Sequence, residues 1–146
     1  MSKNKSLFIV FLSYTIALIC SSVFIVMYKN EDLVYTLLYA DIVATIIIYI
    51  ASYIFRNSSI YDPYWSVVPP FLLLFWIIKI DHINILNTLL LAFSVLFWAI
   101  RLTYNWIRGW KGLNQEDWRY IDLNNKSGAY YQLVNFSGIH LFPTII

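Results

Sequence analysis

The sequence predicts an all-α integral membrane protein, a bundle of four transmembrane helices with further helices along one membrane face and the start of a fifth span. Two observations carry this prediction. Hydrophobic residues make up 60% of the 146 residues and charged residues only 12%, whereas roughly a quarter of the residues in a soluble domain are charged. The apolar residues also gather in runs of about twenty, the length that a helix needs to cross hydrocarbon. We therefore expect residues 1–146 to form a single membrane domain.

The predicted spans are apolar runs separated by short polar connections, and they cover residues 7–28, 33–55, 63–80 and 85–100. The first run is too long for a cleaved signal peptide, and no small-residue cleavage site follows it. Asp62 and Pro63 predict the start of the third helix, as an N-cap followed by proline at the first helical position. The polar turn from Asp81 to Asn84 is so short that spans three and four should be antiparallel.

The basic residues predict the orientation of these spans. With the N-terminus inside, eight Lys and Arg residues fall on inside segments and only Lys29 and Lys79 on outside turns. This asymmetry follows the positive-inside rule, and it places residues 101–140 in the cytoplasm. The membrane would be the bacterial inner membrane or the endoplasmic reticulum. The eight inside residues are Lys3, Lys5, Arg56, Arg101, Arg108, Lys111, Arg119 and Lys126.

The chain after the fourth span changes in composition. Residues 101–140 combine polar, aromatic and charged side chains, and about forty residues are too few for an independent core. We therefore expect helices lying at the cytoplasmic membrane face. Residues 141–146 begin another apolar run that stops after six residues, so we expect a cut fifth span and a fragment of a longer protein.

A polar stripe continues beyond the fourth span. Trp98, Arg101, Asn105 and Arg108 follow one another at spacings of three, four and three, which places them on one helix face. Two guanidinium groups at a membrane face suit a ligand that carries phosphate, because arginine bonds phosphate oxygens bidentately. The alternative is that both arginines extend to lipid headgroups, which needs no specific ligand.

Polar groups also occur inside the predicted spans. Asp41 lies eight residues into the second span, where an ionised carboxylate facing lipid costs about 3 kcal/mol, so it should face the bundle. It would either hydrogen-bond a neighbouring helix or act in function. Pro69 and Pro70 remove two backbone donors within the third span, and we expect a broken helix beside a wet cavity. His82 and His140 are isolated, no metal-ligand spacing occurs, and a net charge of +2 indicates no nucleic-acid partner.

Three motifs carry a family resemblance. They are Ser59 to Pro69 (SIYDPYWSVVP), Trp98 to Leu102 (WAIRL) and Glu116 to Tyr120 (EDWRY). From about Leu33 onward the sequence resembles the domain of unknown function 1295 branch of the steroid 5-alpha-reductase-like membrane enzymes. The resemblance implies an oxidoreductase of lipid metabolism that takes NADPH from the cytoplasm. Its substrate would be the carbon–carbon double bond of a membrane lipid or steroid-like enone.

The resemblance also implies site residues. Related enzymes use a carboxylate with a tyrosine as the acid, and Asp62 with Tyr64 matches that pair, with Asp41 as the reserve candidate. The residues expected to hold NADPH are Arg101, Asn105, Arg108, Glu116, Asp117, Arg119 and Tyr120.

One part of the family pattern is missing, and other functions stay open. The family's C-terminal half carries an Arg-His-Pro-Asn-Tyr-like cofactor motif followed by Gly-Glu, which this sequence lacks. We therefore expect the chain by itself to bind NADPH poorly and to be inactive. The alternatives are a related membrane methyltransferase that uses S-adenosylmethionine, a non-enzymatic lipid-binding or assembly protein, and a transporter. No inverted repeat supports the transporter.

Overall fold

The computed structural model describes residues 1–28, 32–80 and 84–145, and the regular elements in these ranges are all helical. Lys29 and residues 81–83, which include His82, lie outside the described residues. The all-α prediction is confirmed. The helices are α1 (Lys3–Met27), α2 (Leu33–Phe55), α3 (Tyr64–Lys79), α4 (Ile85–Gly109), α5 (Trp118–Ser127), α6 (Tyr131–Val134) and α7 (Phe142–Ile145), with short 3₁₀ turns η1 (Ser58–Ile60) and η2 (Gly128–Tyr130) and a π-helix η3 (Asn135–Leu141).

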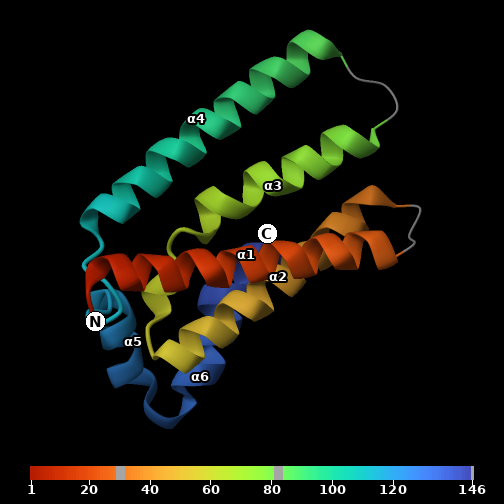
Figure 1. The fold of residues 1–146 in the computed structure, drawn as a ribbon. Helices are drawn as coiled ribbons and strands as arrows, with labels where there is room; N and C mark the ends of the chain where they lie inside the picture. The colour runs from red at the N-terminus through yellow and green to blue at the C-terminus, as the bar shows by residue number, and fades with distance from the viewer. Residues whose placement is uncertain (29–31, 81–83, 146) are drawn as a thin grey trace.

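Helices α1 and α2 lie side by side and form the centre of the bundle (Figure 1). Small residues line their interface, since Ala17 and Ala40 are completely buried and Ala44 is 1% exposed. Without large side chains between them the two backbones approach closely, and the Ser21 hydroxyl donates to the carbonyl of Ala40 at 2.8 Å. Such small-residue contacts are typical of helices that associate within membranes.

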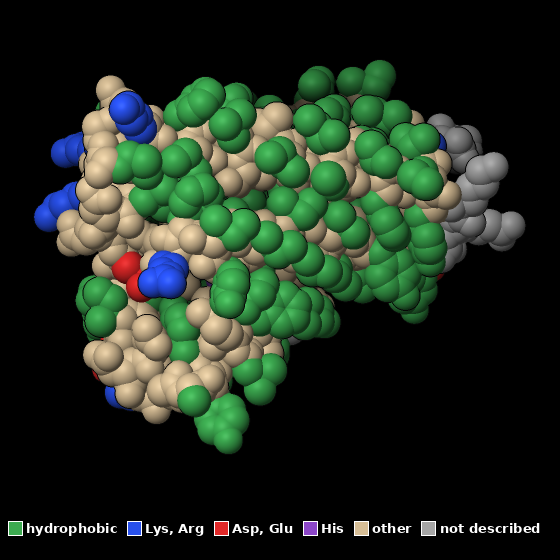
Figure 2. Space-filling view, turned by 60° about the horizontal axis from the view of Figure 1, so that its bottom comes forward, with side chains coloured by type: hydrophobic (Ala, Val, Ile, Leu, Met, Phe, Trp, Pro, Cys, Tyr) green, Lys and Arg blue, Asp and Glu red, His purple; other side chains and the backbone are tan. Residues whose placement is uncertain are grey.

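Three helices are long and apolar enough to cross a membrane, namely α1, α2 and α4, so the chain is an integral membrane protein. The third predicted span forms α3, which has 16 residues. At 1.5 Å per residue it extends about 24 Å, less than the roughly 30 Å of a hydrocarbon core. Four spans and a fifth are therefore not confirmed. Figure 2 shows apolar side chains along the length of the molecule and basic side chains gathered at one end.

Helices α3 and α4 form an antiparallel pair that diverges from α1 and α2 (Figure 1). Helix α4 continues to Gly109, as expected of a fourth span that extends beyond the apolar run. The expected break at Pro69 and Pro70 is wrong, because α3 runs through both. The missing donors instead leave the carbonyls of Trp65 and Ser66 without their helical partners, near the start of the helix.

The start of α3 differs from the prediction in another respect. Its N-cap is Pro63, and no side chain caps it, so Asp62 is not the capping residue. The Asp62 carboxylate is bonded elsewhere, to Tyr120 of α5.

The segments after α4 fold back against the end of α2 (Figure 1). Helices α5 and α6 are short, as expected of the region after span four, and η3 and α7 continue from α6 along α2. The hydroxyls of Thr144 and Thr45 meet at 2.7 Å, which ties α7 to the middle of α2. Thr144 therefore contacts the same Thr45 side chain that lies one helical turn after Asp41.

Candidate functional site

A partly buried carboxyl–hydroxyl pair joins α2 to the start of α3. The Tyr64 hydroxyl donates to Asp41 Oδ1 at 2.5 Å and to the Asp41 carbonyl at 2.9 Å. It accepts from Thr45 Oγ1 at 2.8 Å. Tyr64 is 4% exposed, and the ring of Tyr61 stacks on it at 4.7 Å. Asp41 thus faces the bundle, as the cost of a carboxylate facing lipid predicted, and its partner is the buried hydroxyl of Tyr64.

The chain after α2 brings this pair together. Arg56 takes the left-handed conformation, with φ of 50°, and turns the chain back from the end of the helix. The Tyr14 hydroxyl of α1 donates to the carbonyl of Ile60 at 2.9 Å, and Tyr61 donates to the carbonyl of His140 at 3.0 Å. These two buried bonds fix the segment before α3, so Tyr64 reaches α2 in one orientation.

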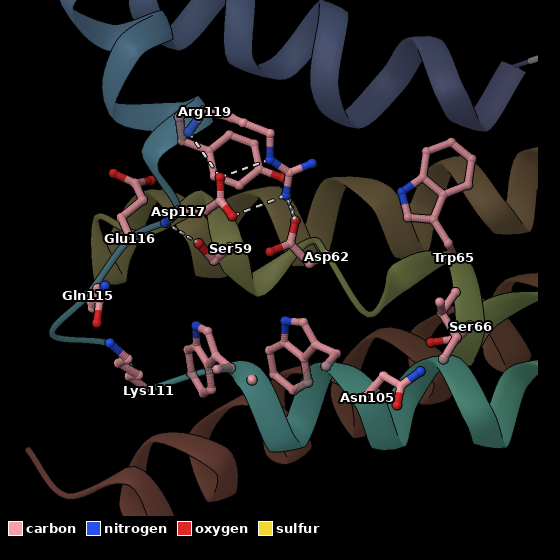
Figure 3. A pocket seen from close by; sticks show the side chains of 15 residues that line it. Ser59, Asp62, Trp65, Ser66, Asn105, Lys111, Gln115, Glu116, Asp117 and Arg119 are labelled. Atoms are coloured by element: carbon pink, nitrogen blue, oxygen red, sulfur yellow. Dashed lines mark hydrogen bonds and ion pairs between the residues drawn. The ribbon is translucent and has the colours of Figure 1, made fainter.

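A second group of candidate residues surrounds a cavity of about 560 Å³ between the end of α4 and the segment before α3 (Figure 3). The predicted residues Asp62, Asn105, Glu116, Asp117, Arg119 and Tyr120 all line it. Trp65 and Ser66 of α3 line it too, so the cavity begins one residue along the chain from Tyr64. Its other lining residues are Ser59, Leu102, Trp106, Gly109, Trp110, Lys111 and Gln115.

Asp62 is the centre of the polar contacts in this cavity. Its Oδ1 accepts from the Tyr120 hydroxyl at 2.6 Å and lies 3.6 Å from the guanidinium of Arg119. Burial raises the pKa of Asp62 above its usual range, although the Tyr120 bond and Arg119 oppose the shift. Burial also raises the pKa of the Tyr120 hydroxyl, so that proton stays on the tyrosine. The pair can hold a proton at the cavity wall.

Arg119 is engaged by carboxylates. Its Nε donates to Asp117 Oδ1 at 2.8 Å and its terminal nitrogen to Oδ2 at 3.3 Å, which lowers the pKa of Asp117. Two of the five N–H donors of the guanidinium are used by Asp117, and the side chain is 58% exposed, so N–H donors remain for a ligand phosphate. Lys111 is the other basic residue of the cavity wall.

Two stacked indoles form the α4 side of the cavity. Trp106 and Trp110 lie 4.7 Å apart with their planes 22° from parallel. Both Nε1–H groups are buried, and neither has an acceptor among the described residues. A buried donor without an acceptor is costly, so these indoles favour a ligand that brings acceptor oxygens.

The loop from Trp110 to Asp117 is held by the chain that precedes α3. The Asn57 amide donates to the carbonyls of Leu113 at 3.0 Å and Gln115 at 3.1 Å. Glu116 Oε1 accepts from the Ser58 backbone at 2.6 Å, so it closes the wall. Gly112 has φ of 108°, and a Cβ there would lie 2.9 Å from the Ser6 hydroxyl.

The structure does not bring the predicted site residues together as one site. The expected partners Asp62 and Tyr64 bond elsewhere: Asp62 to Tyr120, and Tyr64 to Asp41. Arg101 and Arg108 do not line the cavity, although Asn105 does. The cavity faces positions 102, 105, 106 and 109 of α4, so it meets only the edge of the predicted stripe.

Asn57 and Thr45 take part in these contacts although they are not among the predicted site residues. Thr45 had a signal in the sequence, because it lies four residues after Asp41 and shares its helix face. Asn57 had none, because only the folded chain shows its partners. Trp106 and Trp110 did have one, because two indoles four residues apart share a helix face.

A family model described as "Protein of unknown function (DUF1295)" matches residues 48–146. The matched region contains Tyr64 and the whole wall of the cavity, whereas Asp41 precedes it. No curated protein and no solved structure matches the chain significantly.

Proposed function

We propose that this chain, which belongs to the DUF1295 protein family, is part of a membrane oxidoreductase that reduces the double bond of a lipid or steroid-like enone with NADPH. The observation that carries the proposal is the 2.5 Å contact between the buried Tyr64 and the half-buried Asp41, which joins two apolar helices. It is the carboxylate–tyrosine pair that the resemblance to steroid 5-alpha-reductase-like enzymes implies, with Asp41 in the place expected of Asp62. The apolar surroundings suit a lipid substrate.

The reaction adds a hydride to the β-carbon of the enone and a proton to the resulting enolate. NADPH supplies the hydride when it is bound. In the reacting state Asp41 carries a proton and donates it across the same contact to the Tyr64 oxygen, which frees the Tyr64 proton for the carbonyl oxygen of the substrate. The Tyr64 hydroxyl stabilises the negative charge that grows on that oxygen and gives its proton to the enolate, and the proton of Asp41 replaces it. Thr45, which donates to Tyr64 at 2.8 Å, holds the hydroxyl in place.

The cavity beside Trp65 is the part of the described chain that fits a nicotinamide cofactor. The indole N–H groups of Trp106 and Trp110 lack acceptors, which the oxygens of a carboxamide or a phosphate would supply. Lys111 adds the positive charge that phosphate needs. The carboxylates of Glu116 and Asp117 can accept from the hydroxyls of the nicotinamide ribose, and the 2′-phosphate on the other ribose of NADPH would pair with a basic residue such as Lys111 or Arg119.

The test is enone-dependent oxidation of NADPH in detergent by the purified intact enzyme of which this chain is proposed to be part, because the chain by itself is expected to bind NADPH poorly. Tyr64→Phe should lower the rate about a hundredfold or more, because it removes the proton donor. The quenching of indole fluorescence by NADPH should be unchanged in that variant. Tyr104→Phe is the matched control, since Tyr104 is 62% exposed on α4.

The catalytic pair and the cofactor cavity can be refuted by different results. Equal rates for wild type and Tyr64→Phe would remove the carboxylate–tyrosine pair from the mechanism. Absence of quenching by NADPH in the wild type would remove the cofactor from the cavity between α3 and α4.

A further inference from the structure

A second polar cavity, of about 510 Å³, lies at the C-terminal end of α2, beyond Glu116, which lines both cavities. It is separate from the carboxylate–tyrosine pair and from the stacked indoles. The residues that line it are Ser52, Tyr53, Ile54, Arg56, Asn57, Ser58, Glu116, Asn124, Gly128, Ala129, Tyr131, Gln132 and Asn135.

Asn135 places a buried hydrogen-bond acceptor without a donor at the wall of this cavity. The residue is 2% exposed, and its amide nitrogen donates to Ser58 Oγ at 2.9 Å. Its Oδ1 is buried and has no donor among the described residues. Asn135 begins the π-helix η3, an irregularity that occurs frequently at functional sites. The amide oxygen calls for a ligand that brings an N–H or O–H group.

Arg56 supplies a positive charge at the wall of this cavity. It caps α2 in the left-handed conformation, where glycine is the usual residue and a side chain is uncommon. Its backbone N–H bonds the last turn of the helix, and its guanidinium has no partner among the described residues. With Glu116 on the same wall, the cavity presents one positive and one negative group.

An apolar groove of about 520 Å³ continues from this cavity along α2. Ile46, Tyr49 and Ile50 form its α2 side, and Leu133 and Phe136 the side that faces them. The rings of Tyr49 and Phe136 lie 4.8 Å apart. Gln132 lines both the groove and the polar cavity, so the two adjoin at that residue. The groove runs from the end of α2 toward its middle, the direction of a lipid tail.

We propose that the cavity and groove bind one phospholipid whose headgroup carries an ammonium with N–H donors, of the phosphatidylethanolamine type. The phosphate pairs with Arg56, and the ammonium donates to Asn135 Oδ1 beside the carboxylate of Glu116. One acyl chain lies in the groove. A choline headgroup carries the same charges but has no N–H, so it leaves the Asn135 oxygen unsatisfied.

The experiment compares two lipids on the same protein, without NADPH or substrate. The detergent-purified full-length chain is mixed with equal amounts of phosphatidylethanolamine and phosphatidylcholine of identical acyl chains, and bound lipid is counted by native mass spectrometry. Phosphatidylethanolamine should be retained about tenfold more, the effect of one charge-assisted hydrogen bond. Equal retention of the two lipids would overturn the proposal.

A further arm separates a lipid from a soluble phosphate ester. Free phosphoethanolamine, added in about tenfold excess, should leave the lipid bound, because it has no chain to occupy the groove. Displacement by the free headgroup would overturn the lipid assignment and leave a soluble ligand of the same chemistry.

Three variants assign the effect to residues. Asn135→Leu should remove the preference between the lipids. Arg56→Gln should lower retention of both lipids about tenfold with their ratio unchanged, since both carry phosphate. Ile50→Trp, at a half-exposed position of α2, should fill the groove and lower both even if Asn135→Leu does not fold. The control Lys5→Gln removes an exposed charge from α1 and should change neither the retention of the two lipids nor their ratio. Unchanged retention in Arg56→Gln or Ile50→Trp would contradict the site.

Discussion

The contact between Tyr64 and Asp41 should be measurable as a coupling free energy in the unfolding of the chain. Tyr64→Phe removes the hydroxyl that donates to Asp41 Oδ1 at 2.5 Å. Thr45 keeps Thr144 as a partner at 2.7 Å, so Asp41 is the group that loses most. An unsatisfied buried acceptor costs about 1–3 kcal/mol, and hydrogen bonds between membrane helices average about 0.6 kcal/mol. We expect Tyr64→Phe to lower the free energy of unfolding by about 1 kcal/mol.

The partner substitution should cost less. In Asp41→Leu the Tyr64 hydroxyl still donates to the carbonyl of residue 41, at 2.9 Å in the wild type. The loss is therefore about 0.6 kcal/mol, and insertion into the membrane should be retained. The double variant lacks both groups, so neither is left unsatisfied. Its loss should fall short of the sum of the single losses by roughly 0.5–1 kcal/mol.

The assay is reversible unfolding in mixed micelles, with wild type, both single variants and the double variant measured under one condition. Tyr104→Phe controls for the loss of an exposed hydroxyl and should stay within about 0.5 kcal/mol of wild type. Additivity of the two substitutions within about 0.3 kcal/mol would refute the contact, and with it the proton exchange that the mechanism needs.

The remaining predictions concern the loop, the cavity and the orientation. Burial raises the pKa of folded Asp62 above its unfolded value, so the folded chain binds that proton more tightly. The stability of wild type relative to Asp62→Asn should therefore rise as pH falls from above the folded pKa to below the unfolded one, as measured by unfolding at several pH values. Gly112→Ala should lower the melting temperature, because φ is 108° and its Cβ would meet an α1 hydroxyl at 2.9 Å, whereas Gly109→Ala, with open space around it, should not. Arg108→Lys and Arg108→Ala should bind NADPH as the wild type does, because Arg108 does not line the cavity; a ten- to hundredfold loss, about that of one phosphate contact, would return it to the site. An engineered thiol at Lys111 should resist an impermeant reagent from outside, and its reaction would reverse the predicted orientation.

The sequence by itself determined the membrane helices, because length and apolarity are local properties. The second span was predicted at 33–55 and forms Leu33–Phe55, and the first, predicted at 7–28, forms Lys3–Met27. The free-energy cost of an ionised carboxylate that faces lipid also predicted that Asp41 faces protein. The third span was predicted at 63–80, and α3 occupies nearly that range. Whether a helix of that length crosses the membrane is not a local property, since it depends on the neighbours that cover its ends.

The partners of the polar residues were decided only by the tertiary structure. Asp62 and Tyr64 stand two positions apart in one motif. Asp62 nevertheless accepts from Tyr120, and Tyr64 donates to Asp41. Those partners come from α5 and α2, and the motif contains no information about which helix packs against it. A hydrogen bond requires heavy atoms about 3 Å apart, and such a distance between remote segments is set by how whole helices pack. For the same reason a helical wheel placed Arg101 and Arg108 with Asn105, while the wall of the cavity includes only Asn105.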